Sequence, residues 1–520
     1  MNVPASGAVT GDLDAFFALP APFPALARKN PAPAVPVPPG GIGRPLPDTL
    51  GGGKGGHSMA VRKAPEHARQ ARPRSRGPRR TLGTIGLTGL GIGGIIGAGF
   101  FLGSGIVIHR TGPGIVLTYL LAGIILAQVM GAITSLAVNV PVESSYQEYI
   151  HRYLGPFAGF LLGWVVYLSG ILATGSEAVA MAVYSQTWLP GVPLGVYAVS
   201  YVLVIVGLNL FGVADLGKAE TGMSLLKVGV LLAFILTAAL LLGHLLPVPP
   251  AAGPAGLPRP GTFLPRGPGA VLQAMLIVIF SYAGVTTVAM AASRTRRPGR
   301  TVPQAALYTT VGVVLLYALS VAGLVLLLPY TRFSPQQSPF VTALRAYHLI
   351  WFARVFNAAV LVASFSVMAG TFYATEWMLI SMALHGGAPA YFRHAEPGRP
   401  YRALITTALL VLATVSLAFV LPRSVYTELT AASSYFSFIN WMLILLAFTV
   451  WHRRARRPRE PVSALAFGAP YGAWVMAAAI AALGIYSLTI RSFRPAFLVF
   501  AALTLGVTLS WMWLQRRPAA

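Results

Sequence analysis

The stretch GIGGIIGAGFFLGSG, residues 91–105, bears more directly on the fold than any other part of this sequence. It lies in an apolar run that holds ten glycines between Gly83 and Gly105. A glycine inside a helix costs about 1 kcal/mol relative to alanine, so this density predicts a helix that is interrupted or closely approached at its middle. At membrane depth, the backbone groups exposed by a break are tolerated only against protein, a cavity or a ligand. The alternative is close helix packing, because Gly89, Gly93 and Gly97 form successive GxxxG pairs.

Eleven further apolar segments follow this one. Of the 520 residues, 55% are hydrophobic and 10% charged, against roughly 25% charged in an average soluble domain. Each segment can cross about 30 Å of hydrocarbon as a helix. We therefore predict an all-α polytopic membrane protein with about 12 transmembrane helices and no enzymatic activity, because the short connections leave no room for a soluble catalytic domain. The segments cover residues 83–108, 112–139, 156–189, 193–213, 222–247, 269–292, 303–329, 354–385, 403–422, 428–451, 469–490 and 495–515.

Basic residues determine the predicted orientation. The net charge is +25, from 38 Lys and Arg against 13 Asp and Glu. With a cytoplasmic N-terminus, the cytoplasmic segments from Lys63 onward hold 23 Lys and Arg and the external loops hold nine. Because excess Lys and Arg stay on the cytoplasmic side, we expect both termini on the cytoplasmic side of the plasma membrane. These charges then act as topology signals that also touch membrane lipid, and nucleic acid is not a partner.

Residues 1–80 differ in composition from the rest. Residues 1–60 contain 21 Gly plus Pro, and a basic run follows up to Arg80. We predict a disordered cytoplasmic tail, because such a composition cannot build a packed core. Met59 is an alternative start, which N-terminal sequencing of the natural product would test.

Neither a metal site nor a cofactor is expected. The sequence has no cysteine, which excludes disulfides, thiolate metal sites and a cysteine nucleophile. The nine histidines show no HExxH or paired ligand spacing.

Several motifs follow the glycine-rich segment in a characteristic order. They are TGPG (111–114), SYQEYIHRYLGPFAGFLLGW (145–164), TGSEA around Glu177, NLFGVADLGKAE (209–220), LLKV (225–228), FSYAG (280–284), RRPGRTVPQA (296–305), FYATEWMLISMALHGGAPAYF (372–392) and Trp441. In order and spacing, this series resembles the bacterial amino acid permeases of the amino acid/polyamine/organocation superfamily, over about residues 82–455.

The resemblance implies a 5+5 inverted-repeat transporter fold in which helices 1 and 6 are broken. On that pattern the tail occupies residues 1–80. The first repeat, with helices 1–5, covers residues 81–247, and the second, with helices 6–10, covers residues 248–455. Two additional helices and a short tail occupy residues 456–520.

The resemblance also implies that backbone groups at the two breaks hold the substrate. N–H groups would receive its carboxylate, since the end of a half-helix offers orphan donors, and carbonyl groups would accept its ammonium. Gly284 is the one glycine in the interior of span six, so that break is predicted from family position and not from composition. The predicted donors are Gly97, Ala98 and Gly99, and the predicted acceptors lie near Ile95, Phe280, Ser281 and Ala283.

Lys227 lies in the fifth apolar segment, where a charge costs about 2.5–3.5 kcal/mol. It matches the lysine that proton-coupled relatives carry there, near the broken part of span one. We predict that it exchanges a proton during transport. The alternative is a lysine near the cytoplasmic end that extends to the headgroups.

Two acidic residues are further candidates. Glu177, deep in span three, matches the acidic residue of the family's TGxAE pattern and is predicted to line the pocket or to take part in proton movement; the alternative is a structural hydrogen bond. Glu376 in span eight is less characteristic, because the family usually has Ser-Arg where this chain has Glu376 and Trp377.

The chain also departs from the family pattern. Thr286 stands where many relatives place a glutamate, and Arg294 occupies a second acidic position, so chemistry assigned to those carboxylates does not carry over. This loss of negative charge disfavours a dedicated polyamine or arginine carrier, although Glu177 leaves one open. Phe280 and Tyr282 stand at gate positions, with packing as the alternative.

The predicted function is inward amino acid transport by alternating access, with the proton as coupling ion. An amino acid or amine exchanger and a non-transporting amino acid sensor remain as alternatives. The sequence does not identify the amino acid.

Overall fold

The computed structural model describes residues 83–140, 142, 146–211, 216–247, 263–290, 292, 295, 297–335, 337–393, 401–421, 424–455 and 458–516. The predicted disordered tail and Arg294 lie outside these residues. Among the residues described, the regular elements are helices. This confirms the predicted all-α fold class.

The first half of the chain forms its helices where the apolar runs lie, because only a helix satisfies every backbone group of a single segment in hydrocarbon. The first span is divided into three pieces, α2 to α4. The helices are α2 (Thr84–Ile95), α3 (Ala98–Phe101), α4 (Gly103–Thr111), α5 (Ile115–Asn139), α6 (Gln147–Leu154), α7 (Pro156–Ser185), α8 (Leu194–Phe211) and α9 (Leu216–Leu242).

The second half begins with another divided span, α10 and α11. The helices are α10 (Pro268–Ser281), α11 (Thr287–Met290), α12 (Pro298–Leu327), α13 (Pro339–Ala346), α14 (Ile350–Leu384), α15 (Tyr401–Val420), α16 (Val425–Arg454), α17 (Tyr471–Ser487) and α18 (Arg494–Arg516).

Eight helical stretches are long and apolar enough to cross a membrane, and four shorter apolar helices, α2, α8, α10 and α17, accompany them. Together they account for all twelve predicted segments, so the chain is a multi-pass membrane protein. Two helices were not predicted, α6 and α13. Each has only eight residues, with a few buried side chains such as Tyr149 and Phe340, and is too short to register as an apolar segment.

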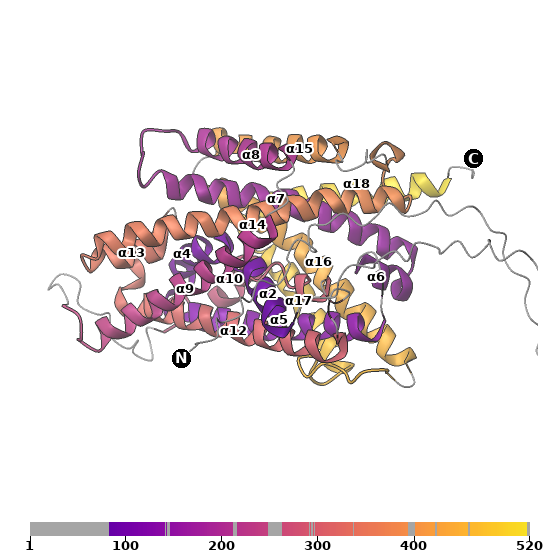
Figure 1. Cartoon of the computed structure of the whole chain (residues 1–520), viewed down its shortest axis with the longest axis horizontal. Coiled ribbons are helices and arrows are strands. Elements are labelled where there is room, and N and C mark those ends of the chain that lie inside the picture. The colour runs from indigo at the N-terminus through magenta and orange to yellow at the C-terminus, as the bar shows by residue number, and fades with distance from the viewer. Residues whose placement is uncertain are drawn as a thin grey trace, which may run out of the picture. The chain divides into compact units, whose positions relative to one another are not determined.

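The divided spans lie inside the bundle. α2 contacts α9, α12 and α14, and α10 contacts α4, α5 and α16. In Figure 1, α2 and α10 appear between α14 and α12, while α8 and α15 lie side by side at one edge. This arrangement surrounds the two breaks with protein, as polar backbone in a membrane requires.

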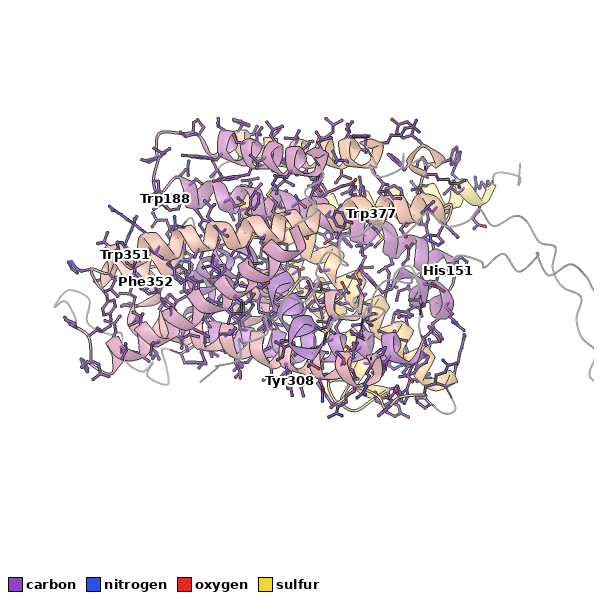
Figure 2. The ribbon with its side chains drawn as sticks, in the orientation of Figure 1. His151, Trp188, Tyr308, Trp351, Phe352 and Trp377 are labelled. Carbon is purple, nitrogen blue, oxygen red and sulfur yellow. The ribbon has the colours of Figure 1, made fainter. Side chains whose placement is uncertain are left out.

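Aromatic side chains lie toward both ends of the bundle. Figure 2 shows Trp188 and Trp351 near one end, and His151 of α6 near the other. Trp188 is 42% exposed and Trp351 76% exposed. Tryptophan is enriched where a membrane meets water, so these side chains fit a headgroup region at the end where α7 finishes and α14 begins.

Candidate functional site

The first span is interrupted at the glycine-rich segment. α2 ends at Ile95, Ile96 and Gly97 are extended, and a helix resumes at Ala98. The predicted interruption is therefore present. Gly97 is also closely approached, because a Cβ there would lie 2.6 Å from a carboxylate oxygen of Glu177 and 3.1 Å from Cγ2 of Val367.

The sixth span is interrupted as well, although its composition gave little sign of it. α10 ends at Ser281 and α11 begins at Thr287, with turns between them. Gly284 has φ +94°, a conformation that side chains disfavour. A Cβ on it would also overlap the carbonyl oxygen of Gly94, so the two breaks lie directly against each other and require this glycine.

Glu177 reaches the first break from α7. Its side chain is 3% exposed. The backbone N–H of Ala98 donates to both carboxylate oxygens, each at 3.1 Å. From the sequence we predicted that this N–H binds the substrate's carboxylate. In the structure it donates instead to the carboxylate of Glu177. The reason is local: α3 packs against α7, and Gly97 has no side chain to keep Glu177 away.

Three of the four predicted ammonium acceptors divide into two groups. The Phe280 carbonyl accepts the N–H of Ala283 at 3.0 Å and so closes a turn. The hydroxyl of Tyr317, on α12, donates to the Ser281 carbonyl at 3.1 Å and approaches the Ile95 carbonyl at 3.4 Å. One side chain that the sequence analysis did not select thus bridges both breaks.

Lys227 lies in the protein interior. Its side chain is 0% exposed, and its ammonium donates to the Gly93 carbonyl at 2.7 Å and to the Ser366 hydroxyl at 2.9 Å. The charge is therefore held at the end of α2 and is not extended to the headgroups. Glu177 is near enough to interact with it electrostatically.

A layer of hydroxyl groups fixes the helix that resumes after the first break. Ser281 donates to the Gly99 carbonyl at 2.6 Å, and Tyr426 of α16 donates to the Ala98 carbonyl at 2.8 Å. These bonds connect α3 to α10 and α16. A movement of α3 relative to those helices must break them.

The aromatic positions of the second break are packed against neighbours. Tyr282 is 0% exposed, and its hydroxyl donates to the Tyr119 carbonyl at 3.1 Å. Phe280 is buried, and its ring lies 2.8 Å from where a Cβ on Gly99 would stand. Tyr282 therefore contacts α5 and Phe280 contacts α3. These contacts fit a gating role and a packing role equally.

Two other candidates lie differently. Thr286, in the second break, is half-buried. Glu376 is 2% exposed and is near enough to Tyr167 to interact with it electrostatically, and the hydroxyl of Tyr167 meets that of Thr407 at 3.3 Å. Tyr167 is ten residues along α7 from Glu177, or about 15 Å. The structure therefore brings Lys227 and Glu177 to the breaks, but not Glu376.

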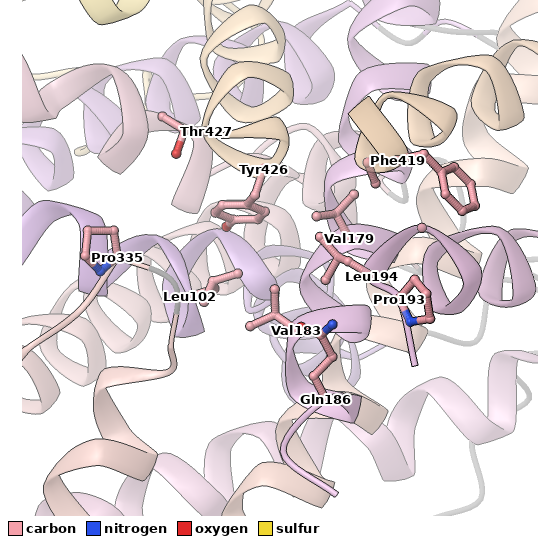
Figure 3. Close-up of a pocket in the computed structure, with 12 residues that line it drawn as sticks. Leu102, Val179, Val183, Gln186, Pro193, Leu194, Pro335, Phe419, Tyr426 and Thr427 are labelled. Carbon is pink, nitrogen blue, oxygen red and sulfur yellow. The ribbon is translucent and has the colours of Figure 1, made fainter. Parts of the chain in front are cut away.

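A cavity of about 530 Å³ lies beside the first break. Leu102, Val183, Gln186, Phe419 and Tyr426 are among its lining residues, and Figure 3 shows them around it. Its walls come from the start of α16 and from the ends of α7 and α15. The charge distribution predicts that this end of the bundle faces outward.

Sequence reasoning missed three residues that bind backbone groups or Lys227 at the break. Tyr317 and Tyr426 are hydroxyl-bearing aromatics in or beside apolar runs, and Ser366 lies in the eighth apolar segment. The available signal was a polar atom within or beside an apolar run. This signal does not identify the hydrogen-bond partner, because the partners lie on other helices.

Comparisons with known proteins agree on one family. The sequence model of the family described as "Amino acid permease" matches residues 86–514. The chain is 29% identical over 446 residues to the gamma-aminobutyric acid permease of Bacillus subtilis, covering 85% of this chain and 95% of that protein. It is 32% identical over 390 residues to the aromatic amino acid transport protein AroP of Escherichia coli O6:H1, covering 74% of this chain and 85% of AroP. The AroP of Salmonella typhimurium is 31% identical over 388 residues.

Proposed function

This chain belongs to the amino acid permease family, and on that premise we propose that it takes up an amino acid across the bacterial plasma membrane by proton symport. Transport proceeds by alternating access, with both termini in the cytoplasm. Residues 81–247 and 248–455 form the two inverted repeats, a division supported by the fact that each begins with an interrupted helix. Residues 456–520 add the last two helices.

The observation that carries the proposal is the contact between the two breaks. Gly284 abuts Gly94, and the Ile95 and Ser281 carbonyls converge on one hydroxyl oxygen. Orphan backbone donors and acceptors therefore meet inside the bundle, where a zwitterion can replace the side chains that now satisfy them. The substrate's carboxylate binds at Gly97 to Gly99 and its ammonium at the converging carbonyls.

Glu177 and Lys227 couple this site to protons. While Glu177 is a carboxylate, it occupies the Ala98 N–H and repels a second carboxylate. A proton on Glu177 removes that repulsion and lets the substrate's carboxylate take its place. The other ionisable groups around Glu177 are Lys227, Tyr184, Tyr317 and Tyr426.

Lys227 acts at the inner side of the same break. Its ammonium holds the Gly93 carbonyl, at the end of α2. Loss of its proton turns this charge-assisted hydrogen bond into a weaker neutral one, which loosens α2 relative to α9 and favours a change of access. The cavity beside Leu102 and Tyr426 supports an external entrance to the site.

The test is uptake into proteoliposomes with and without an inward proton gradient. A labelled amino acid mixture serves as substrate. Unlabelled aromatic amino acids and γ-aminobutyrate are the first competitors, because the names of the relatives specify these compounds. Accumulation that requires the gradient supports symport. Exchange by preloaded vesicles alone would replace symport with antiport, and binding without any flux would indicate a sensor.

A further inference from the structure

The hydroxyl of Tyr317 stands where two orphan carbonyl groups converge. The Ser281 carbonyl ends α10 and the Ile95 carbonyl ends α2, and their oxygens lie 3.1 Å and 3.4 Å from the Tyr317 oxygen. The last carbonyls of a helix have no partner within it. Tyr317 is 0% exposed, so water does not serve them from that side.

This geometry restricts where an amino group can bind. A nitrogen bonded to both carbonyls must lie within hydrogen-bond distance of each, and the Tyr317 oxygen occupies that position already. The amino group and the hydroxyl therefore compete for the same two acceptor oxygens. An ammonium group has three donors and a positive charge, and hydrogen bonds from a charged donor are about twice as strong as neutral ones.

We propose that Tyr317 is a built-in occupant of the amine position, which the amino group of the substrate displaces on binding. This inference rests on the proposed function, since it takes the Ile95 and Ser281 carbonyls as the amine acceptors. It makes Tyr317 a specificity-determining residue: a ligand with an ammonium group displaces the hydroxyl, whereas a carboxylate without one leaves it in place.

The ring of Tyr317 links this displacement to α3. It stacks on Phe100 with centroids 3.7 Å apart and planes 4° from parallel, and Tyr282 lies 5.2 Å away on another side. A hydroxyl cannot leave the carbonyls unless the ring shifts against Phe100. Because Phe100 belongs to α3, arrival of the amino group acts on the helix that resumes after the break.

Ligand binding to the purified full-length chain in detergent tests the inference. The probes are the protein L-amino acids and γ-aminobutyrate, each paired with its deaminated carboxylate, such as L-phenylalanine with 3-phenylpropanoate. Tyr317→Phe should bind the amino-bearing probe about fivefold more tightly than the wild type, because one neutral hydrogen bond no longer competes. Its affinity for the deaminated partner should not change.

Tyr119→Phe is the matched control. Tyr119 is also 0% exposed and lies edge-on to Tyr317 with ring centroids 5.6 Å apart, but its hydroxyl meets the Ser281 hydroxyl and not a carbonyl. This variant should leave the preference for amino-bearing probes unchanged. An equal shift in both variants would indicate a general loosening of the aromatic cluster and would overturn the inference.

A measurement on the otherwise intact protein covers the case in which Tyr317→Phe does not fold. With 3-fluorotyrosine placed at position 317, the fluorine resonance should shift when an amino-bearing probe binds and stay unchanged with its deaminated partner. Unchanged or weaker binding by a folded Tyr317→Phe, identical resonances with both probes, or no binding of any probe would each overturn the inference. Gradient-driven uptake by the wild type would still support the proposed function.

Discussion

Replacement of Lys227 by methionine should abolish the effect of a proton gradient while leaving a folded protein. Methionine has a similar length and no charge, so it fills the same space between α2, α9 and α14. Lys227 is 0% exposed, and its ammonium has Gly93 and Ser366 as partners. The substitution therefore removes a charge and a donor at once, with opposite effects on stability.

The two effects nearly cancel. Removal of a buried charge from the membrane interior relieves about 2.5–3.5 kcal/mol. Leaving the Gly93 carbonyl without a donor costs about 1–3 kcal/mol. The net change in the free energy of unfolding should thus lie between a loss of about 0.5 and a gain of about 2.5 kcal/mol, and the variant should reach the membrane in normal amounts.

The effect on transport is much larger. One proton moving down a gradient of one pH unit supplies about 1.4 kcal/mol, which permits a tenfold accumulation of the substrate. A gradient of about two units permits roughly 100-fold accumulation through a 1:1 symporter. Lys227→Met should reduce this ratio to about one, because the variant can no longer exchange the proton.

Proteoliposomes loaded with unlabelled substrate provide the internal control. Exchange needs the binding site and the change of access but no net movement of protons, so Lys227→Met should retain exchange after losing accumulation. Lys227→Arg should lose accumulation and also slow exchange, since arginine keeps its proton throughout and continues to hold the Gly93 carbonyl. If Lys227→Met accumulates substrate as the wild type does, the lysine is only a structural donor to the Gly93 carbonyl and the coupling argument fails.

Two further changes probe the breaks, and a third serves as a control. Gly284→Ala should weaken substrate binding at least tenfold by radioligand assay, since φ +94° alone costs a side chain about 1–3 kcal/mol and the new Cβ would overlap the backbone of Gly94. Gly207→Ala, where a Cβ meets nothing within 4 Å, should bind normally. Glu177→Gln should make the dissociation constant independent of pH, because a neutral amide no longer repels the substrate's carboxylate. A persistent pH dependence, measured by the same assay across the neutral range, would place the competing proton elsewhere.

The helices were predictable from the sequence because a long apolar segment in hydrocarbon can satisfy its own backbone hydrogen bonds only as a helix. The first break was predictable from glycine density around Gly97. The second was predicted only by family position, because a single glycine, Gly284, serves both the positive φ and the close approach to Gly94. With eight residues each, α6 and α13 are too short to be recognised as apolar segments.

The side chains that satisfy the breaks were only partly predictable. Lys227 and Glu177 were selected because a charge in an apolar segment is costly and demands a partner. Tyr317 was missed because a tyrosine in an apolar run resembles a packing residue. The carbonyl groups that its hydroxyl contacts are 222 and 36 positions away in the sequence, and only the folded helices bring them together.

The contacts of Lys227, Glu177 and Tyr317 follow from one physical constraint. A break in a membrane helix exposes backbone groups, and each one left unpaired in this low-dielectric interior costs about 1–3 kcal/mol. A transporter must spend part of its cycle empty, so its own side chains have to satisfy these groups whenever the substrate is absent. Binding then exchanges internal hydrogen bonds for those of the substrate, and only the difference appears as affinity. In the proposed mechanism, this exchange keeps binding weak enough for release, and Glu177 and Lys227 together couple it to protons.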